Sequence, residues 1–182
     1  MAIVEDLVES APALARYSFQ GVPDIRIIVF QGYPVMAMLR LATTASDGKA
    51  NLHQGAVGVG LDIGSGRSLN AVQFNRPITL HPDTGLALEN IQIDNWDTML
   101  EMASCCYEAT GLGYMGVDLV VDAEKGPLLL ELNARPGLAI QMANGRGLLP
   151  RLRLIESLKR PHLTPRERAD FARDNFAAAA GH

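Results

Sequence analysis

The sequence has few cysteines, and the two that it has cannot easily pair. Cys105 and Cys106 are neighbours in the chain. Neighbouring residues on a helix point in different directions, so we expect no structural disulfide between them. A protein without structural disulfides is typical of a reducing compartment, which favours the cytoplasm.

Three further absences exclude classes of protein. No apolar run approaches the roughly 20 residues that a membrane-spanning helix needs. The net charge of −4 gives no general attraction to nucleic acid. Residues 1–6 have neither a basic region nor a hydrophobic stretch, so no secretory signal is visible. We therefore expect a cytoplasmic protein with no nucleic-acid or membrane partner, and 182 residues suffice for a domain with a sizeable core.

What the sequence does contain is a pair of strand-forming stretches around a short turn. Residues 116–122 and 128–133 are rich in strand formers, and Ala123-Glu124-Lys125-Gly126 separates them. A two-residue loop at Glu124-Lys125 would pair Val121 with Leu128, Leu119 with Leu130 and Val117 with Leu132. That face of the hairpin is apolar, so we expect it to point at a core.

The same register brings polar side chains together on the other face. Asp118 falls opposite Glu131, and directly opposed residues have Cβ atoms roughly 5 Å apart. Asn133 projects from the same face, two residues beyond Glu131. Carboxylates this close repel each other unless a positive charge lies between them. Mg²⁺ shared with a phosphate fits such oxygen ligands. The alternative is an ordinary hairpin with acidic residues on its wet side.

A second hairpin is predicted over Asp24–Phe30 and Val35–Leu39, turning at Gln31-Gly32. Both of its faces are apolar except at Arg26. Burying a lone guanidinium would be unfavourable, so we expect Arg26 to pair with a carboxylate or to contact a phosphate.

Helical patterns complete the expected fold. A helix is predicted from a cap at Asp94 to a stop at Gly111. The C-terminal third of the chain is also predicted to be helical. We predict an α+β fold, a mostly antiparallel sheet with helices packed mainly on one face. The expected division is a domain over residues 1–160 and a helical, partly disordered tail over residues 161–182.

These motifs together resemble a known superfamily. Asp118, then Glu131-Leu132-Asn133 and Pro136-Gly137, resemble the magnesium hairpin of ATP-grasp ligases. Asp24-Ile25-Arg26 and residues 49–56 resemble the D-I-R strand and the R-S-N-L-H-R-G-G segment of the RimK-type α-L-glutamate ligases. The resemblance runs from Val4 to Leu149 and departs from that branch at Lys49-Ala50 and Gln54.

The resemblance implies roles for individual residues. Asp118, Glu131 and Asn133 would bind Mg²⁺, or Mn²⁺, that bridges the ATP phosphates. Arg26 and Arg135 would neutralise charge that develops during the reaction. Independently of the resemblance, a lone histidine beside a strand, such as His53, is more often a hydrogen-bonded structural residue than a base. The nucleotide would be contacted by residues in three places: Asp6 and Leu7 near adenine, Asp24 near the ribose, and Lys49 with Asn51 near the phosphates.

The implied activity is ATP-dependent ligation of a small-molecule or peptide carboxylate to an amine through an acyl phosphate. The competing hypothesis is a non-catalytic nucleotide-binding or interaction module that keeps the half-fold. The resemblance covers only the C-terminal portion of an ATP-grasp enzyme, without the lysine-bearing subdomain. We therefore expect the isolated chain to be inactive and to bind Mg-nucleotide weakly. We also expect it to associate with a missing N-terminal half, or with itself through the Asp24–Leu39 hairpin or residues 4–8.

Overall fold

The protein is built on one antiparallel sheet, seen in a computed structural model that describes residues 7–158 and 163–178. Seven strands follow the order β5-β4-β3-β2-β1-β6-β7. The α+β prediction is thus confirmed. The strands are β1 (Asp24–Phe30), β2 (Tyr33–Leu41), β3 (Val57–Leu61), β4 (Ser68–Gln73), β5 (Arg76–Ile78), β6 (Tyr114–Asp122) and β7 (Gly126–Asn133).

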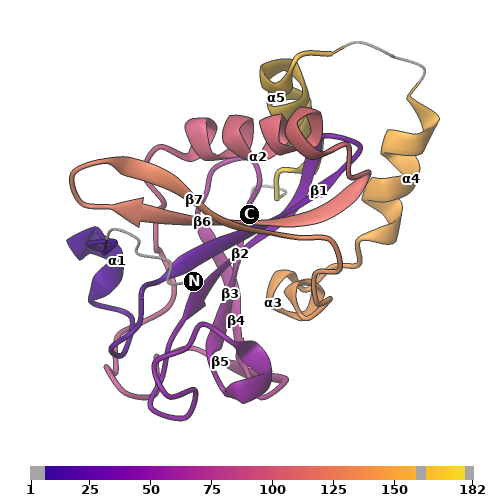
Figure 1. The fold of residues 1–182 in the computed structure, drawn as a ribbon. Coiled ribbons are helices and arrows are strands. Elements are labelled where there is room, and N and C mark those ends of the chain that lie inside the picture. The colour runs from indigo at the N-terminus through magenta and orange to yellow at the C-terminus, as the bar shows by residue number, and fades with distance from the viewer. Residues whose placement is uncertain (1–6, 159–162, 179–182) are drawn as a thin grey trace.

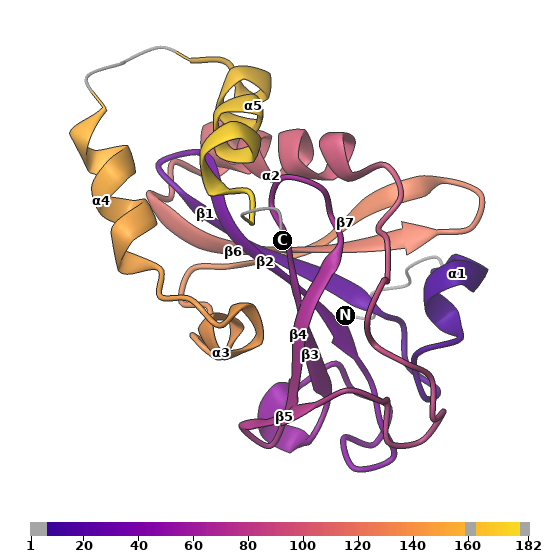
Figure 2. The same cartoon turned by 180° about the vertical axis from the view of Figure 1, so that it is seen from behind.

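Helices lie on both faces of this sheet. Helices α2 and α5 lie on one side and α3 on the other, with α4 at the end between them (Figures 1 and 2). A short α1 and a 3-10 turn, η1, precede β1 and β3. The helices are α1 (Pro12–Ala15), η1 (Leu52–Gln54), α2 (Trp96–Thr110), α3 (Ile140–Asn144), α4 (Leu149–Ser157) and α5 (Pro165–Phe176).

The β1–β2 hairpin forms the centre of the sheet, as its two apolar faces predict. Gln31 and Gly32 have φ of 48° and 81°, the left-handed pair that a tight hairpin turn requires. All nine residues of β2 are buried. The predicted self-association through Asp24–Leu39 therefore lacks its exposed surface, because the chain's own helices and strands cover this hairpin. Residues 4–6 of the other proposed surface lie outside the described residues.

Side chains alternate across the sheet and give its two faces different chemistry. Ile25, Ile27 and Val29 of β1 share one face with Leu119 of β6, and all four are buried. Helix α2 packs here through Met99, Leu100 and Ala103, which are fully buried. We call this the apolar face. The opposite face, which we call the charged face, carries the remaining β1 positions, among them Asp24 and Arg26.

The α2 and C-terminal elements differ in detail from expectation. Helix α2 ends at Gly111 as predicted, but its N-cap is Asn95, at φ 55°, and not Asp94. In the expected tail, α5 begins with a capping box between Thr164 and Glu167. It packs on α2 and β2, where Arg168 is buried. The Ala-rich end beyond residue 178 lies outside the described residues.

Candidate active site

A row of charged side chains crosses four strands on the charged face. The register places Asp24 of β1 opposite Arg40 of β2, and Arg26 of β1 opposite Asp118 of β6. Asp118 in turn lies opposite Glu131 of β7, as predicted from the sequence. Directly paired residues on neighbouring strands project from the same face of the sheet, so the pairing register alone brings these side chains into one row.

The register behind that pairing differs from the expected one near the turn. Asp122 pairs with Gly126, so the loop has three residues, and the Asp122 side chain accepts hydrogen bonds from the N–H groups of Glu124 and Lys125. The predicted partners of Leu119 and Val121 are therefore wrong: Leu119 pairs with Leu129, and Val121 with Pro127. A bulge between Asp118 and Leu119 then restores the expected Asp118–Glu131 and Val117–Leu132 pairs.

This irregularity also changes the exposure of the edge strand. Leu129 and Leu130 are 47% and 53% exposed, so the expectation of a wholly core-facing apolar side fails at β7. β7 is the last strand of the sheet, and the helices of the apolar face reach only part of it.

Asp118 is the centre of the charged row. Its Oδ1 accepts from Arg26 Nε at 2.7 Å, and its Oδ2 accepts from Arg26 Nη2 at 2.5 Å and from Arg40 Nη2 at 2.8 Å. The Asp118 side chain is fully buried. Burial alone would raise the pKa of Asp118, but the bonds from Arg26 and the charge of Arg40 outweigh it and lower that pKa. Asp118 is thus held as a carboxylate.

Asp24 and Arg40 form the second ion pair of the row. Arg40 Nε and Nη2 donate to the two carboxylate oxygens of Asp24 at 2.5 and 2.8 Å. Burial nonetheless raises the pKa of Asp24 to about 6, against the lowering effect of Arg40. Asp24 was predicted to lie near a ribose. Both of its oxygens are already engaged with Arg40.

Glu131 and Asn133 form the exposed end of the row. The Glu131 side chain is 58% exposed, and its Oε1 lies 3.9 Å from Arg26 Nη2. Asn133 Nδ2 donates to Glu131 Oε1 at 2.8 Å and approaches Asp118 Oδ2 at 3.4 Å. The three predicted metal ligands therefore converge.

The row offers an incoming cation one exposed carboxylate, Glu131, because the oxygens of Asp24 and Asp118 are engaged with arginines. Three carboxylates, Asp24, Asp118 and Glu131, face two guanidiniums, Arg26 and Arg40, which leaves one excess negative charge at the exposed end. Across the described residues, no three His, Cys, Asp or Glu side chains gather closely enough to hold a metal ion. An ion here would need the Asn133 amide and oxygens from outside the protein, as Mg²⁺ commonly does.

Two segments lie over the charged face beside the row. At Gly58, opposite Arg40, a Cβ would lie 2.8 Å from Leu52 of η1. At Gly116, opposite Asn133, a Cβ would lie 2.8 Å from Pro136 and 3.6 Å from Arg26 Nε. Glycine leaves room at both positions for covering segments that touch the sheet directly.

The predicted phosphate-contacting residues lie on the first of these segments. Asn51 Oδ1 accepts from the His53 N–H at 3.0 Å and so caps η1. Lys49 is 62% exposed at its side chain, with Nζ 3.5 Å from Asp47 Oδ2. A Cβ at Gly137 would lie 3.9 Å from His53 Nε2, so the two covering segments approach each other.

Arg135 and Leu7, two of the remaining predicted residues, are not members of the row. Arg135 is exposed and borders a concavity formed by α3, α4 and the start of β6. Leu7 is 85% exposed and lies beside Asp122, at the turn end of β6. Asp6 lies outside the described residues.

Sequence reasoning missed Arg40. Arg40 is a charge within an apolar strand, as Arg26 is, so the sequence alone could have identified it. Its importance emerges from the register, which places it beside Asp24 and within reach of Asp118.

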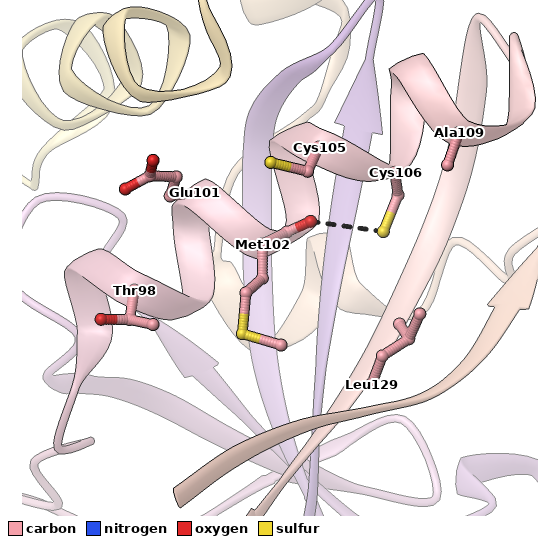
Figure 3. A pocket seen from close by; sticks show the side chains of 7 residues that line it. All are labelled: Thr98, Glu101, Met102, Cys105, Cys106, Ala109 and Leu129. Carbon is pink, nitrogen blue, oxygen red and sulfur yellow. Dashed lines mark hydrogen bonds between the residues drawn. The ribbon is translucent and has the colours of Figure 1, made fainter.

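A separate apolar groove lies under α2 (Figure 3). It has a volume of about 400 Å³ and is bordered by Met102, Cys105, Cys106 and Leu129. The Cys106 thiol donates to the Met102 carbonyl at 3.3 Å, and burial raises the pKa of both thiols. Protonated thiols are poor nucleophiles, so neither cysteine of this groove is an activated nucleophile.

The antiparallel sheet and its carboxylate–amide row agree with the resemblance to ATP-grasp ligases noted in the sequence. The family model described as "Sugar-transfer associated ATP-grasp" matches residues 1–157, and the chain belongs to that family. The match is not to the RimK-type branch, so the expected relationship to glutamate ligases is not supported.

Searches of curated proteins and of solved structures give weaker similarities or none. A search of the curated proteins found no match. Among solved structures, the ATP-grasp ligase PsnB complexed with a minimal precursor is 17% identical, with a TM-score of 0.37. The alignment covers 69% of this chain and 30% of that chain. In the part of the chain that the structure describes, no helix is long and apolar enough to cross a membrane.

Proposed function

We propose that this chain carries the phosphate-binding and metal-binding groups of an ATP-dependent carboxylate–amine ligase. The observation that supports this most is the row formed by Arg26, Asp118, Glu131 and Asn133. It combines an acidic, exposed end with a guanidinium fixed behind it. Family membership supports ATP as the nucleotide.

The proposed reaction has two steps. A substrate carboxylate oxygen attacks the γ-phosphorus of ATP, and the bond from that phosphorus to the ADP oxygen breaks. The products are an acyl phosphate and ADP. An amine then attacks the acyl carbon, the amide forms, and phosphate and a proton leave.

The chain's own residues bind and orient in this scheme. Glu131 and Asn133, with Asp118 behind them, would hold Mg²⁺ or Mn²⁺, which supplies neutralising charge to the phosphates when bound. Arg26 is held by Asp118 and faces Glu131, where it can neutralise negative charge on a transferring phosphoryl group. Preorganised charge of this kind needs little rearrangement during reaction.

Calorimetric titration with Mg-ADP tests the proposal. We expect weak binding by the full chain and no detectable binding by Glu131→Gln. Glu124→Gln is the matched control, because Glu124 is an exposed acid in the turn of the same hairpin. Equal binding by the two variants would contradict the assignment of the site.

Phosphate release separates the enzyme from the alternative function. ATP consumption that depends on both a carboxylate and an amine supports a ligase. Since the isolated chain is expected to be inactive, the assay also contains a lysine-bearing ATP-grasp half. Glu131-dependent nucleotide binding without phosphate release in that mixture supports the non-catalytic module.

A further inference from the structure

An open apolar groove begins where the charged row ends. Its volume is about 490 Å³, and it is bordered by the start of β6, the segment after β7, α3 and α4. Leu138 and Leu149 are each 55% exposed at its edge, and Leu152 and Tyr114 line it. Exposed leucines grouped in a concavity are typical of a binding surface.

The groove is continuous with the candidate active site. Pro136 lines the groove and also packs over Gly116, beside Arg26. Arg135 and Ala134 of the lining directly follow Asn133 in the chain. A molecule lying in the groove would thus have one end at the exposed end of the row.

The groove and the expected adenine contacts lie at opposite ends of β6. Tyr114 begins β6 at the groove, Asp118 lies in the middle, and Asp122 ends the strand. At that far end Glu9 and Ala11 form backbone hydrogen bonds with residues 121–123. Leu7, to which the resemblance assigns an adenine contact, lies beside this end. The groove therefore lies on the opposite side of the acidic row.

The charge of the lining selects for an anion. Among the described residues, Arg135 is the one arginine or lysine that lines the groove, and none of the described lining residues is Asp or Glu. Within residues 7–158 and 163–178, its guanidinium has no ion pair. Burial raises the pKa of the Tyr114 phenol, so this group stays neutral. A guanidinium beside an apolar channel matches a carboxylate on an apolar chain.

We propose that this groove binds the carboxylate substrate of the ligase, and that this substrate is amphipathic. Its carboxylate lies against Arg135, and its apolar part lies along Leu138, Leu149 and Leu152. This inference rests on the proposed function, because only a ligase needs a carboxylate at that position.

Decanoate is a suitable probe, with acetate and decan-1-ol as its two halves. Calorimetry or ligand-observed NMR on the full chain should show binding of decanoate and at least about tenfold weaker binding of either half. Arg135→Gln should weaken decanoate binding by about tenfold and leave decan-1-ol unaffected. Decan-1-ol binding equal to that of decanoate would overturn the anionic assignment.

The location is tested by a matched pair of exposed leucines. Leu149→Glu places a negative charge in the proposed groove and should abolish decanoate binding. Leu129→Glu places the same charge in the separate groove under α2, where Leu129 is 47% exposed, and should leave binding unchanged. Loss of binding in Leu129→Glu alone would show that the probe uses the wrong groove and would overturn the proposal.

Nucleotide binding in the same samples distinguishes this inference from the proposed function. Glu131-dependent Mg-ADP binding with no decanoate binding overturns the substrate class and leaves the ligase proposal standing. Decanoate binding without any Mg-ADP binding leaves an anion-binding groove but overturns its assignment as a ligase subsite.

Discussion

Arg26 and Asp118 face each other across β1 and β6, and the guanidinium donates to both carboxylate oxygens, at 2.7 and 2.5 Å. The same guanidinium lies 3.9 Å from Glu131. A single cation therefore lies between the two carboxylates that the sequence predicts as metal ligands.

Loss of the Asp118 charge should destabilise the fold. Asp118→Asn leaves Arg26 and Arg40 buried with one anion fewer, and breaking such a buried pair costs about 3 kcal/mol. Urea denaturation measures the change in the free energy of unfolding. Glu131→Gln is the control, since the more exposed Glu131 should contribute less than about 1 kcal/mol. Equal destabilisation by the two changes would contradict the central role of Asp118.

Removal of Arg26 should strengthen metal binding in the absence of nucleotide. In Arg26→Met, the repulsion between a guanidinium and an incoming cation is gone, and Mn²⁺ should bind at least about tenfold more tightly. Electron paramagnetic resonance of free Mn²⁺ measures this. Arg76→Met, at an exposed arginine on β5, should bind as the unaltered chain does. No gain in Arg26→Met would show that Arg26 does not compete with the ion.

His81 should make stability depend on pH. Its Nε2 lies 3.2 Å from the Ala42 carbonyl oxygen, and its Nδ1 accepts from the N–H groups of Asp83 and Thr84 at 3.3 Å. This arrangement requires the neutral ring, and burial lowers the pKa of His81 despite the nearby Asp83 carboxylate.

The unfolded chain therefore binds the His81 proton more readily than the folded chain. The contribution of His81 to stability is complete above its unfolded pKa of about 6.5 and is lost as the pH falls through the lowered folded pKa. The difference in unfolding free energy between the unaltered chain and His81→Gln should shrink below about pH 6.5. A constant difference from pH 5 to 8 would contradict this.

Gly60 should not tolerate a side chain. A Cβ there would lie 2.3 Å from the Ala143 carbonyl oxygen, so α3 would have to move. We expect Gly60→Ala to lower the unfolding free energy by about 1–3 kcal/mol. At Gly113 no atom lies within 4 Å of a new Cβ, so Gly113→Ala is the control. Similar thermal melts for both variants would disprove the close contact.

The sequence predicts those parts of the fold that depend on residues close together in the chain. The β1–β2 hairpin, its turn and the stop of α2 at Gly111 follow from strand alternation and from residues that favour positive φ. The Asp118–Glu131 pair was predicted correctly, although the predicted turn was one residue too short. The bulge shifts the register by one residue and so compensates for the short turn. No sequence pattern in β7 predicts this bulge.

The site was predictable only in part because its charges pair across strands. Arg26 stood out as a charge in an apolar strand, and Arg40 has the same property. Which carboxylate each arginine meets depends on the lateral order of β2, β1, β6 and β7. That order is set by packing of the whole sheet and cannot be read from any single strand.

The glycines of the charged face have a consequence for how this domain can change. Where Pro136, Leu52 and α3 rest on Gly116, Gly58 and Gly60, they contact bare main chain and not a layer of side chains. The apolar face, in contrast, is filled by interlocking side chains that can be exchanged for others of similar volume. Mutation and selection can therefore repack the apolar face of the sheet while the walls of the site keep their positions.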